Sequence, residues 1–82
     1  TEAKKIADLA CAHRRMFAPH VGMSGIDGAA CVHLLCAGSN PLVYESDCAA
    51  YNPFRDELVI GAPKVVDGWI EPSHARQECA KR

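Results

Sequence analysis

Residues 29–48 read AACVHLLCA-GSNP-LVYESDC, two apolar segments on either side of the cluster Gly38-Ser39-Asn40-Pro41. Turn residues between apolar runs predict a β-hairpin with strands 29–37 and 42–48. Counting outward from the turn places Cys31 opposite Cys48. Directly opposed residues on antiparallel strands lie about 4.5–5.5 Å apart at Cα, which overlaps the range of about 4.4–6.8 Å in disulfides. We therefore predict a Cys31–Cys48 disulfide.

The segments around this hairpin predict three further elements. Apolar residues recur at helical spacing over 1–17, and Pro19 ends that helix. Strand-favouring residues in 57–61 and 64–70 predict a second hairpin. Pro72 and the N-cap residue Ser73 predict a short helix over 74–81.

These elements predict a single small domain over residues 1–82 of the α+β class. We expect a small antiparallel sheet of two hairpins, an N-terminal helix and a short C-terminal helix, stapled by disulfides. The alternative is a mostly-β sandwich.

Five cysteines in 82 residues is a high density for a cytosolic protein. With Cys31 paired to Cys48, a second disulfide between Cys11 and Cys79 would close a loop over most of the chain. Such a bond stabilises by about 3–5 kcal/mol in the chain-entropy model. Cys36 remains as a buried free thiol.

Composition restricts the partners. The net charge is −1, so no general attraction to nucleic acid is expected, and no apolar run reaches the ~18–20 residues that span a bilayer. The cysteine content predicts a secreted, extracellular location.

The candidates for catalysis and metal binding are weak. Cys31 and His33 lie two residues apart on one strand, about 6.5–7 Å, too far for a nucleophile and its base. Cys31-x-His33-x2-Cys36, with Cys11-x-His13 upstream, offers zinc ligands, but residues 31 and 36 point to opposite faces of a strand. Glu45 and Asp47 share a strand face as a carboxylate pair. We predict no catalytic residue, no metal and no cofactor.

Two apolar groups are candidate contacts for another protein. Met16, Phe17 and Met23 cluster where the first helix meets a glycine-rich loop, and methionine-rich loops suit adaptable recognition. Trp69, the single tryptophan, is a candidate anchor.

The cysteines at 11, 31, 48 and 79, together with Asp67-Gly68-Trp69-Ile70 and 73–76, resemble the tendamistat-type α-amylase inhibitors. The resemblance implies a two-disulfide β-sandwich. The Trp-Arg-Tyr loop through which that family inhibits is absent, since residues 13–17 read HRRMF. The inhibitory function is therefore not transferred.

The predicted function is a secreted, disulfide-stabilised protein–protein interaction module of the effector, toxin or inhibitor type, and not an enzyme. The alternatives are a zinc-stabilised intracellular domain and a small hydrolase.

Overall fold

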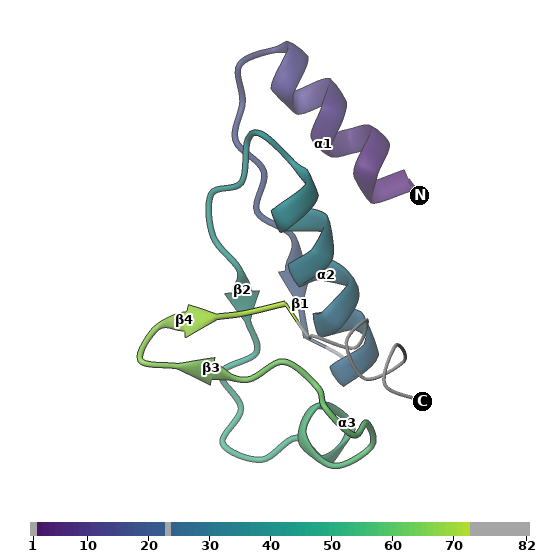
Figure 1. The fold of residues 1–82 in the computed structure, drawn as a ribbon, viewed down its shortest axis with the longest axis vertical. Helices are drawn as coiled ribbons and strands as arrows, with labels where there is room; N and C mark the ends of the chain where they lie inside the picture. The colour runs from purple at the N-terminus through teal and green to yellow at the C-terminus, as the bar shows by residue number, and fades with distance from the viewer. Residues whose placement is uncertain (1, 23, 73–82) are drawn as a thin grey trace, which may run out of the picture.

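The computed structural model describes residues 2–22 and 24–72. Three helices and two two-stranded sheets are found in these residues (Figure 1). In chain order they are α1 (Glu2–Ala12), β1 (His20–Val21), α2 (Gly25–Ala37), β2 (Glu45–Ser46), α3 (Pro53–Asp56), β3 (Val65–Val66) and β4 (Trp69–Ile70).

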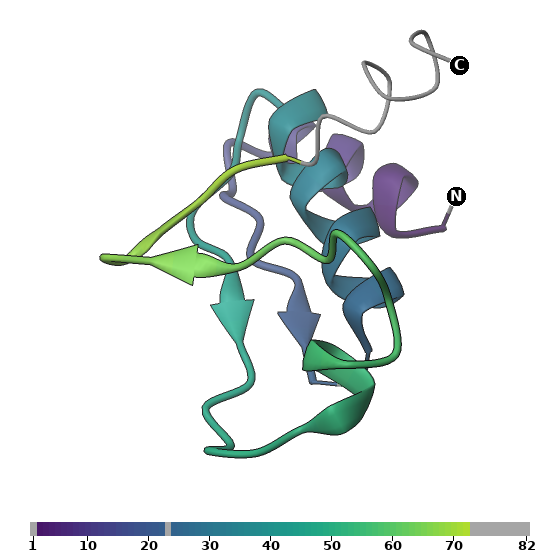
Figure 2. The same cartoon turned by 60° about the horizontal axis from the view of Figure 1, so that its bottom comes forward.

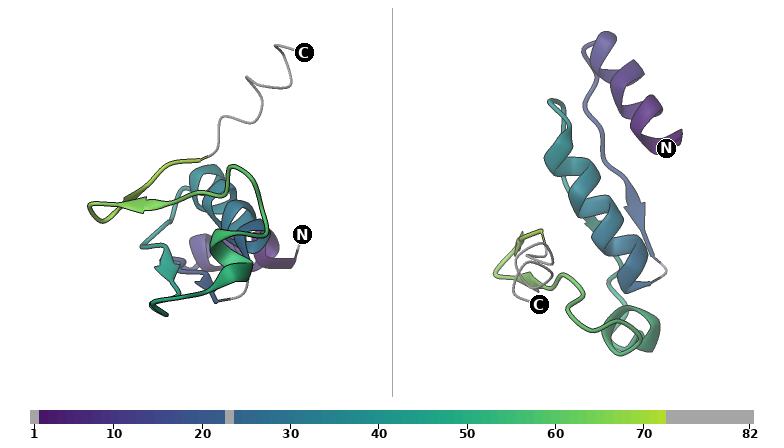
Figure 3. Two further views of the ribbon diagram at one scale, coloured as in Figure 1. Left: turned by 90° about the horizontal axis from the view of Figure 1, so that it is seen from below. Right: turned by 45° about the vertical axis from the view of Figure 1, so that its right-hand side comes forward.

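The centre of the fold is a β-α-β unit. Strands β1 and β2 pair in parallel, and α2 connects them and runs alongside β1 (Figure 3, right). The parallel pairing begins upstream at a bridge between Phe17 and Pro41. There the Phe17 amide donates to the Asn40 carbonyl at 2.8 Å, and the Leu42 amide donates to the Phe17 carbonyl at 2.9 Å.

The predicted first hairpin is wrong because residues 25–37 form a helix. Ser24 is its N-cap, and the Ser24 hydroxyl accepts a 3.3 Å hydrogen bond from the amide of Asp27. Such a cap satisfies one of the free amides of the first turn. The segment is apolar on nearly all sides, so it lacks the helical periodicity that marks an amphipathic helix, and a continuous apolar run reads equally as a strand.

The predicted disulfide staple is wrong for the same reason. Cys31 lies on α2 instead of a strand opposite Cys48, and Cys11, Cys31, Cys36 and Cys48 are all free thiols. Cys36 is exposed, not buried as expected. Cys79 and the helix predicted over 74–81, with its N-cap Ser73, lie outside the described residues.

Helix α1 is joined to the turn after α2 by Asn40. The Asn40 side-chain amide donates to the carbonyl oxygens of Ala7 and Arg15, each at 3.0 Å. Ile6 and Leu9, which belong to the apolar stripe expected to pack inward, are 59% and 62% exposed. The described residues thus leave this face of α1 uncovered.

The predicted second hairpin, with strands 57–61 and 64–70, is wrong, because the observed hairpin lies entirely within 64–70. Strands β3 and β4 pair antiparallel around the turn Asp67-Gly68, with Val65 opposite Ile70. Both turn residues have positive φ, 51° and 79°, as a tight two-residue hairpin loop requires. The hairpin projects from the β-α-β unit (Figure 2 and Figure 3, left).

The core of the described residues is small. Its buried side chains include Ala7, Val21 and Val32, at 3%, 5% and 2% exposure, and Pro19. Parallel sheets are normally covered on both faces. Here α2 covers one face of the β1–β2 sheet, and the other face carries exposed polar side chains.

Candidate active site

The exposed face of the parallel sheet carries a histidine and a carboxylate. In the β1–β2 register His20 is opposite Glu45 and Val21 is opposite Ser46. Val21 faces α2, since its Cγ1 lies 3.9 Å from the position that a Cβ on Gly28 would occupy. Side chains alternate along a strand, so His20 and Glu45 project together from the face away from α2.

The two side chains form a loose pair. The distance between His20 Nε2 and Glu45 Oε1 is 4.0 Å, and the side chains are 78% and 57% exposed. This distance is too long for a direct hydrogen bond, but a water molecule or an oxygen of a reactant can lie between two such groups. When His20 is protonated the two groups attract each other, weakly because water surrounds them.

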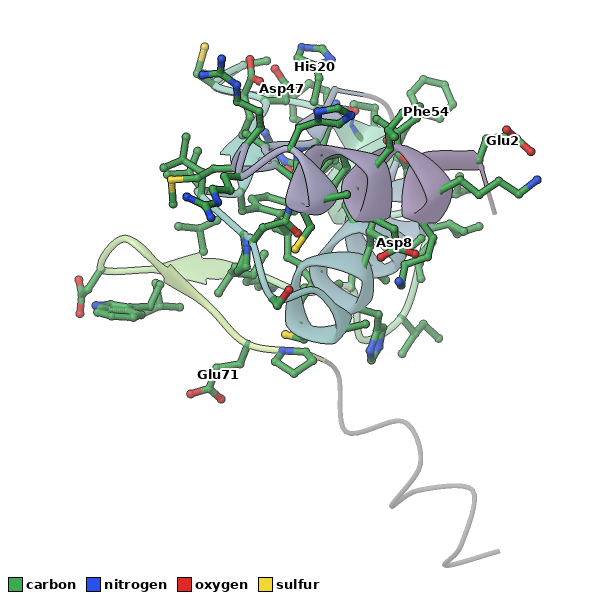
Figure 4. The ribbon with its side chains drawn as sticks, turned by 90° about the horizontal axis from the view of Figure 1, so that it is seen from above. Glu2, Asp8, His20, Asp47, Phe54 and Glu71 are labelled. Atoms are coloured by element: carbon green, nitrogen blue, oxygen red, sulfur yellow. The ribbon has the colours of Figure 1, made fainter. Side chains whose placement is uncertain are left out.

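The pair lies toward the carboxyl end of the paired strands. The parallel pairing runs from Phe17 and Pro41 to Val21 and Ser46, so His20 and Glu45 stand near its last residues. In α/β folds ligands bind outside the carboxyl ends of parallel strands. Figure 4 shows His20 on the same side of the molecule as Asp47, with Glu71 on the opposite side.

The loop after β2 is held by Arg55. The Arg55 guanidinium donates to the carbonyl oxygens of Asp47 (2.9 Å) and Ala49 (3.3 Å), and lies 2.7 Å from Asp56 Oδ2 and 3.6 Å from Asp47 Oδ2. The Asn52 amide donates to Asp47 Oδ2 at 2.9 Å, and its side-chain oxygen caps α3. These contacts fix the direction in which the chain leaves β2.

This network shifts the carboxyl groups toward their charged forms. The hydrogen bond from Asn52, then the amide of Ala49, then the charge of Arg55 lower the pKa of Asp47 below its ordinary value. The hydrogen bond from Arg55 lowers the pKa of Asp56 in the same way. Both carboxylates therefore act as structural anions of the loop.

A polar cavity of about 410 Å³ lies on the α2 side of the sheet, opposite to the histidine pair. Its lining includes Ser24, Tyr44, Arg55 and Lys64. Burial, followed by the nearby Cys31 and Asp27, raises the pKa of the Tyr44 phenol, so Tyr44 stays neutral there.

The carboxylate pair expected from the sequence is divided by the structure. Glu45 is placed opposite His20, whereas Asp47 accepts hydrogen bonds from Asn52 and from the amide of Ala49. The two carboxylates lie at different sites because Glu45 is part of β2, whereas Asp47 comes directly after the last paired residue of that strand.

The cysteine–histidine candidates are also separated. Cys31 and His33 are two positions apart on a helix, where side chains do not face each other, and Cys31 Sγ is directed at Asp27 Oδ1 at 4.0 Å. In residues 2–22 and 24–72 no group of three or more His, Cys, Asp or Glu could hold a metal ion.

The candidate partner contacts remain predictions. Met16 is 60% exposed at the end of the α1 turn, and Phe17 is half-buried in the bridge to Pro41. Trp69 is 80% exposed on β4, at the border of an apolar cavity of about 470 Å³ that Leu35 and Leu42 also line. Met23 lies outside the described residues.

His20 belongs to none of the motifs considered from the sequence. The available signals were local: Ser24 followed three residues later by Asp27 is a capping pattern that places a helix start directly after 20–21. A strand, a short loop and a capped helix would then have placed His20 near the carboxyl end of a strand.

A parallel β-α-β unit is the repeating element of α/β folds, whose ligand sites lie at the carboxyl ends of the strands. The family model described as enolase C-terminal domain-like matches residues 1–76. The chain therefore belongs to the enolase C-terminal domain-like family. No curated protein and no solved structure matches the chain.

The predicted function is overturned by this membership. A family of enzyme domains replaces the effector, toxin or inhibitor module, and the described cysteines form no disulfide. The resemblance to the tendamistat-type inhibitors implied two disulfides, so it loses its basis when the described cysteines are free. The extracellular location stays a prediction without that support. No helix of the described residues is long and apolar enough to cross a membrane.

Proposed function

We propose that this chain contributes an acid–base pair to the active site of an enolase-superfamily enzyme that removes a proton from the α-carbon of a carboxylate substrate. His20 is the general base and Glu45 orients it. Enolase-superfamily sites use a lysine or histidine base to form an ene-diolate. The observation that carries the proposal is the His20–Glu45 pair on the open face of the parallel sheet.

The role of Glu45 follows from which nitrogen it faces. Its carboxylate lies 4.0 Å from Nε2 of His20. When the two side chains close to hydrogen-bond distance, the carboxylate favours the tautomer with hydrogen on Nε2, and the other nitrogen then keeps its lone pair. Glu45 thereby leaves Nδ1 as the proton acceptor and stabilises the imidazolium that forms.

The reaction proceeds in two proton transfers. In the first, the α-carbon–hydrogen bond breaks, the proton goes to His20, and the bonding electron pair moves into the carboxylate to give the ene-diolate. In the second, a proton returns to carbon or the electron pair expels a β leaving group. A positioned base contributes about 10²–10⁴-fold to such a transfer.

The ene-diolate in this superfamily is stabilised by one or two Mg²⁺ ions. The residues that the structure describes do not fit a metal centre by themselves, because no three His, Cys, Asp or Glu among them converge. No step is therefore assigned to a metal held by this chain.

The proposal is tested by hydrogen exchange at carbon. The protein is incubated in D₂O containing Mg²⁺ with lactate, malate or tartrate, and proton NMR follows loss of the α-proton signal. We expect exchange with at least one acid, a loss of about 10²-fold or more in His20→Asn, and a smaller loss in Glu45→Gln.

His33→Asn is the matched control, because His33 is exposed on α2 and lies away from Glu45. It should exchange at the wild-type rate. Exchange that survives unchanged in His20→Asn, or no exchange with any of these acids, would contradict the proposal.

A further inference from the structure

The imidazole of His20 lies over Gly22. A Cβ atom built on Gly22 would stand 3.3 Å from His20 Cε1 and 4.0 Å from its Nε2. Residues 20 and 22 are on the same side of an extended chain, so the ring lies along the chain above the glycine. The same Nε2 is 4.0 Å from Glu45 Oε1.

We infer that Gly22 is a positioning residue for His20: its missing side chain leaves the place in which the imidazole lies beside Glu45. The inference rests on the proposed function for its effect on catalysis, but the positioning itself does not depend on it.

A side chain added at position 22 requires either the backbone or the His20 ring to move. A contact of 3.3 Å between carbon atoms is inside the optimum of about 3.5–4.0 Å, so a methyl group at position 22 must push its neighbour. The His20 side chain is 78% exposed, so its ring can give way more easily than the backbone. A methyl group at position 22 should displace the ring by a few tenths of an ångström, and a larger side chain should displace it further from Glu45.

A larger side chain fills the same place more completely. Gly22→Ala should therefore weaken the pairing, and Gly22→Val should abolish it. The backbone is not expected to resist either substitution, because Gly22 is not among the residues with positive φ.

Gly38→Ala is the matched control. Gly38 also has negative φ (−90°), and a Cβ there would meet its nearest atom at 3.5 Å, which is ordinary contact. It lies at the C-terminal end of α2, away from the histidine pair.

The first measurement is a double-mutant cycle read by NMR. Glu45→Gln should move the ring-proton signals of His20 in the wild-type background and in Gly38→Ala. It should move them much less in Gly22→Ala and not at all in Gly22→Val. Unchanged amide signals of Val21 and Ser46 would show that the sheet is intact.

The second measurement is the carbon exchange assay described above. We expect a loss of up to about 10-fold in Gly22→Ala and a larger loss in Gly22→Val, since a 1 Å misplacement can cost 10²-fold. If the NMR coupling is lost in Gly22→Val while wild-type protein exchanges no acid, the positioning stands and the proposed reaction falls. If His20 is needed for exchange but Gly22→Val keeps both the coupling and the rate, the positioning is overturned and the reaction stands.

Discussion

The side-chain amide of Asn40 donates a 3.0 Å hydrogen bond to the carbonyl oxygen of Ala7, 33 residues earlier in the chain. The same amide reaches Arg15 O at 3.0 Å. Asn40 thus connects α1 to the turn that follows α2. Few apolar contacts join these two segments.

Replacing Asn40 should loosen α1. Asn40→Ala removes two hydrogen bonds, each worth about 0.5–1.5 kcal/mol net, so the free energy of unfolding should fall by about 1–3 kcal/mol. Urea denaturation followed by circular dichroism measures the change. The neighbouring Ser39→Ala removes only the exposed 3.2 Å contact between Ser39 Oγ and Cys11 Sγ of α1, so it should lower the free energy of unfolding by less than Asn40→Ala does. Equal stability of the two variants would contradict the role of Asn40.

Gly25→Ala should destabilise the protein although alanine is the better helix former. A Cβ at Gly25 would lie 2.9 Å from Ala62 Cβ and 2.9 Å from the Arg55 carbonyl oxygen. Overpacking of this kind costs about 1–3 kcal/mol, against a gain of at most about 1 kcal/mol in helix propensity. Urea denaturation should therefore show a lower midpoint.

The double variant Gly25→Ala/Ala62→Gly tests the cause of that loss. It removes one of the two close contacts and leaves the backbone oxygen of Arg55 in place. We expect partial recovery only, and a fully restored midpoint would show that the backbone does not confine α2 there.

Acid should weaken the loop after β2. The folded-state pKa of Asp47 is lowered by Asn52, Ala49 and Arg55. A carboxyl group with a lowered pKa contributes stability that is present above its unfolded pKa of about 3.9 and is lost as pH falls through the folded value. The free energy of unfolding should therefore decline below about pH 4.

Asp47→Asn should reduce this decline, because the amide does not titrate. Asn52→Ala should also reduce it, because it removes the largest cause of the shift. Urea midpoints measured between about pH 2 and 6 test both variants, and a decline as steep as in the wild type would contradict the assignment.

The thiols should react at different rates. Burial, followed by the charge of Asp27, raises the pKa of the Cys31 thiol, so less reactive thiolate is present. Cys36 and Cys48 are exposed. We expect Ellman's reagent to label Cys36 and Cys48 before Cys31 at pH 8, with site-resolved labelling read by peptide mass spectrometry.

Asp27→Asn should speed the labelling of Cys31, because it removes a negative charge that raises the pKa of this thiol. Cys31 should still react after Cys36, because its burial is unchanged. If Cys31 and Cys48 instead react only after a reductant is added, the two residues form a disulfide in solution, and their description as free thiols is wrong.

Local sequence signals account for part of the fold. The helical spacing over 1–17 and Pro19 predict a helix, and the structure has α1 from Glu2 to Ala12. That helix ends earlier, at a turn in which Arg14 adopts a φ of 56°. The pattern Ser24-x-x-Asp27 also marks the start of α2, but the apolar run after it predicts a strand equally well.

The candidate site could not be obtained from such signals. His20 and Glu45 are 25 positions apart, and their meeting depends on α2 covering Val21 and bringing β2 beside β1 in parallel. The antiparallel pairing predicted for 29–37 and 42–48 placed Glu45 against the wrong partner, because a single error of element type changes every later register.

Short-range backbone preferences account for the capped start of α2 at Ser24 and the tight turn at Asp67-Gly68, although the predicted strands ran through the residues after Ser24 and through 67–68. They also account for a helix near the N-terminus, but not for its end at Ala12, well before Pro19. Tertiary structure alone decided the direction of the β1–β2 pairing and the approach of His20 to Glu45. Those depend on which surfaces are buried against α2, and burial is a property of the assembled chain rather than of any short stretch in it.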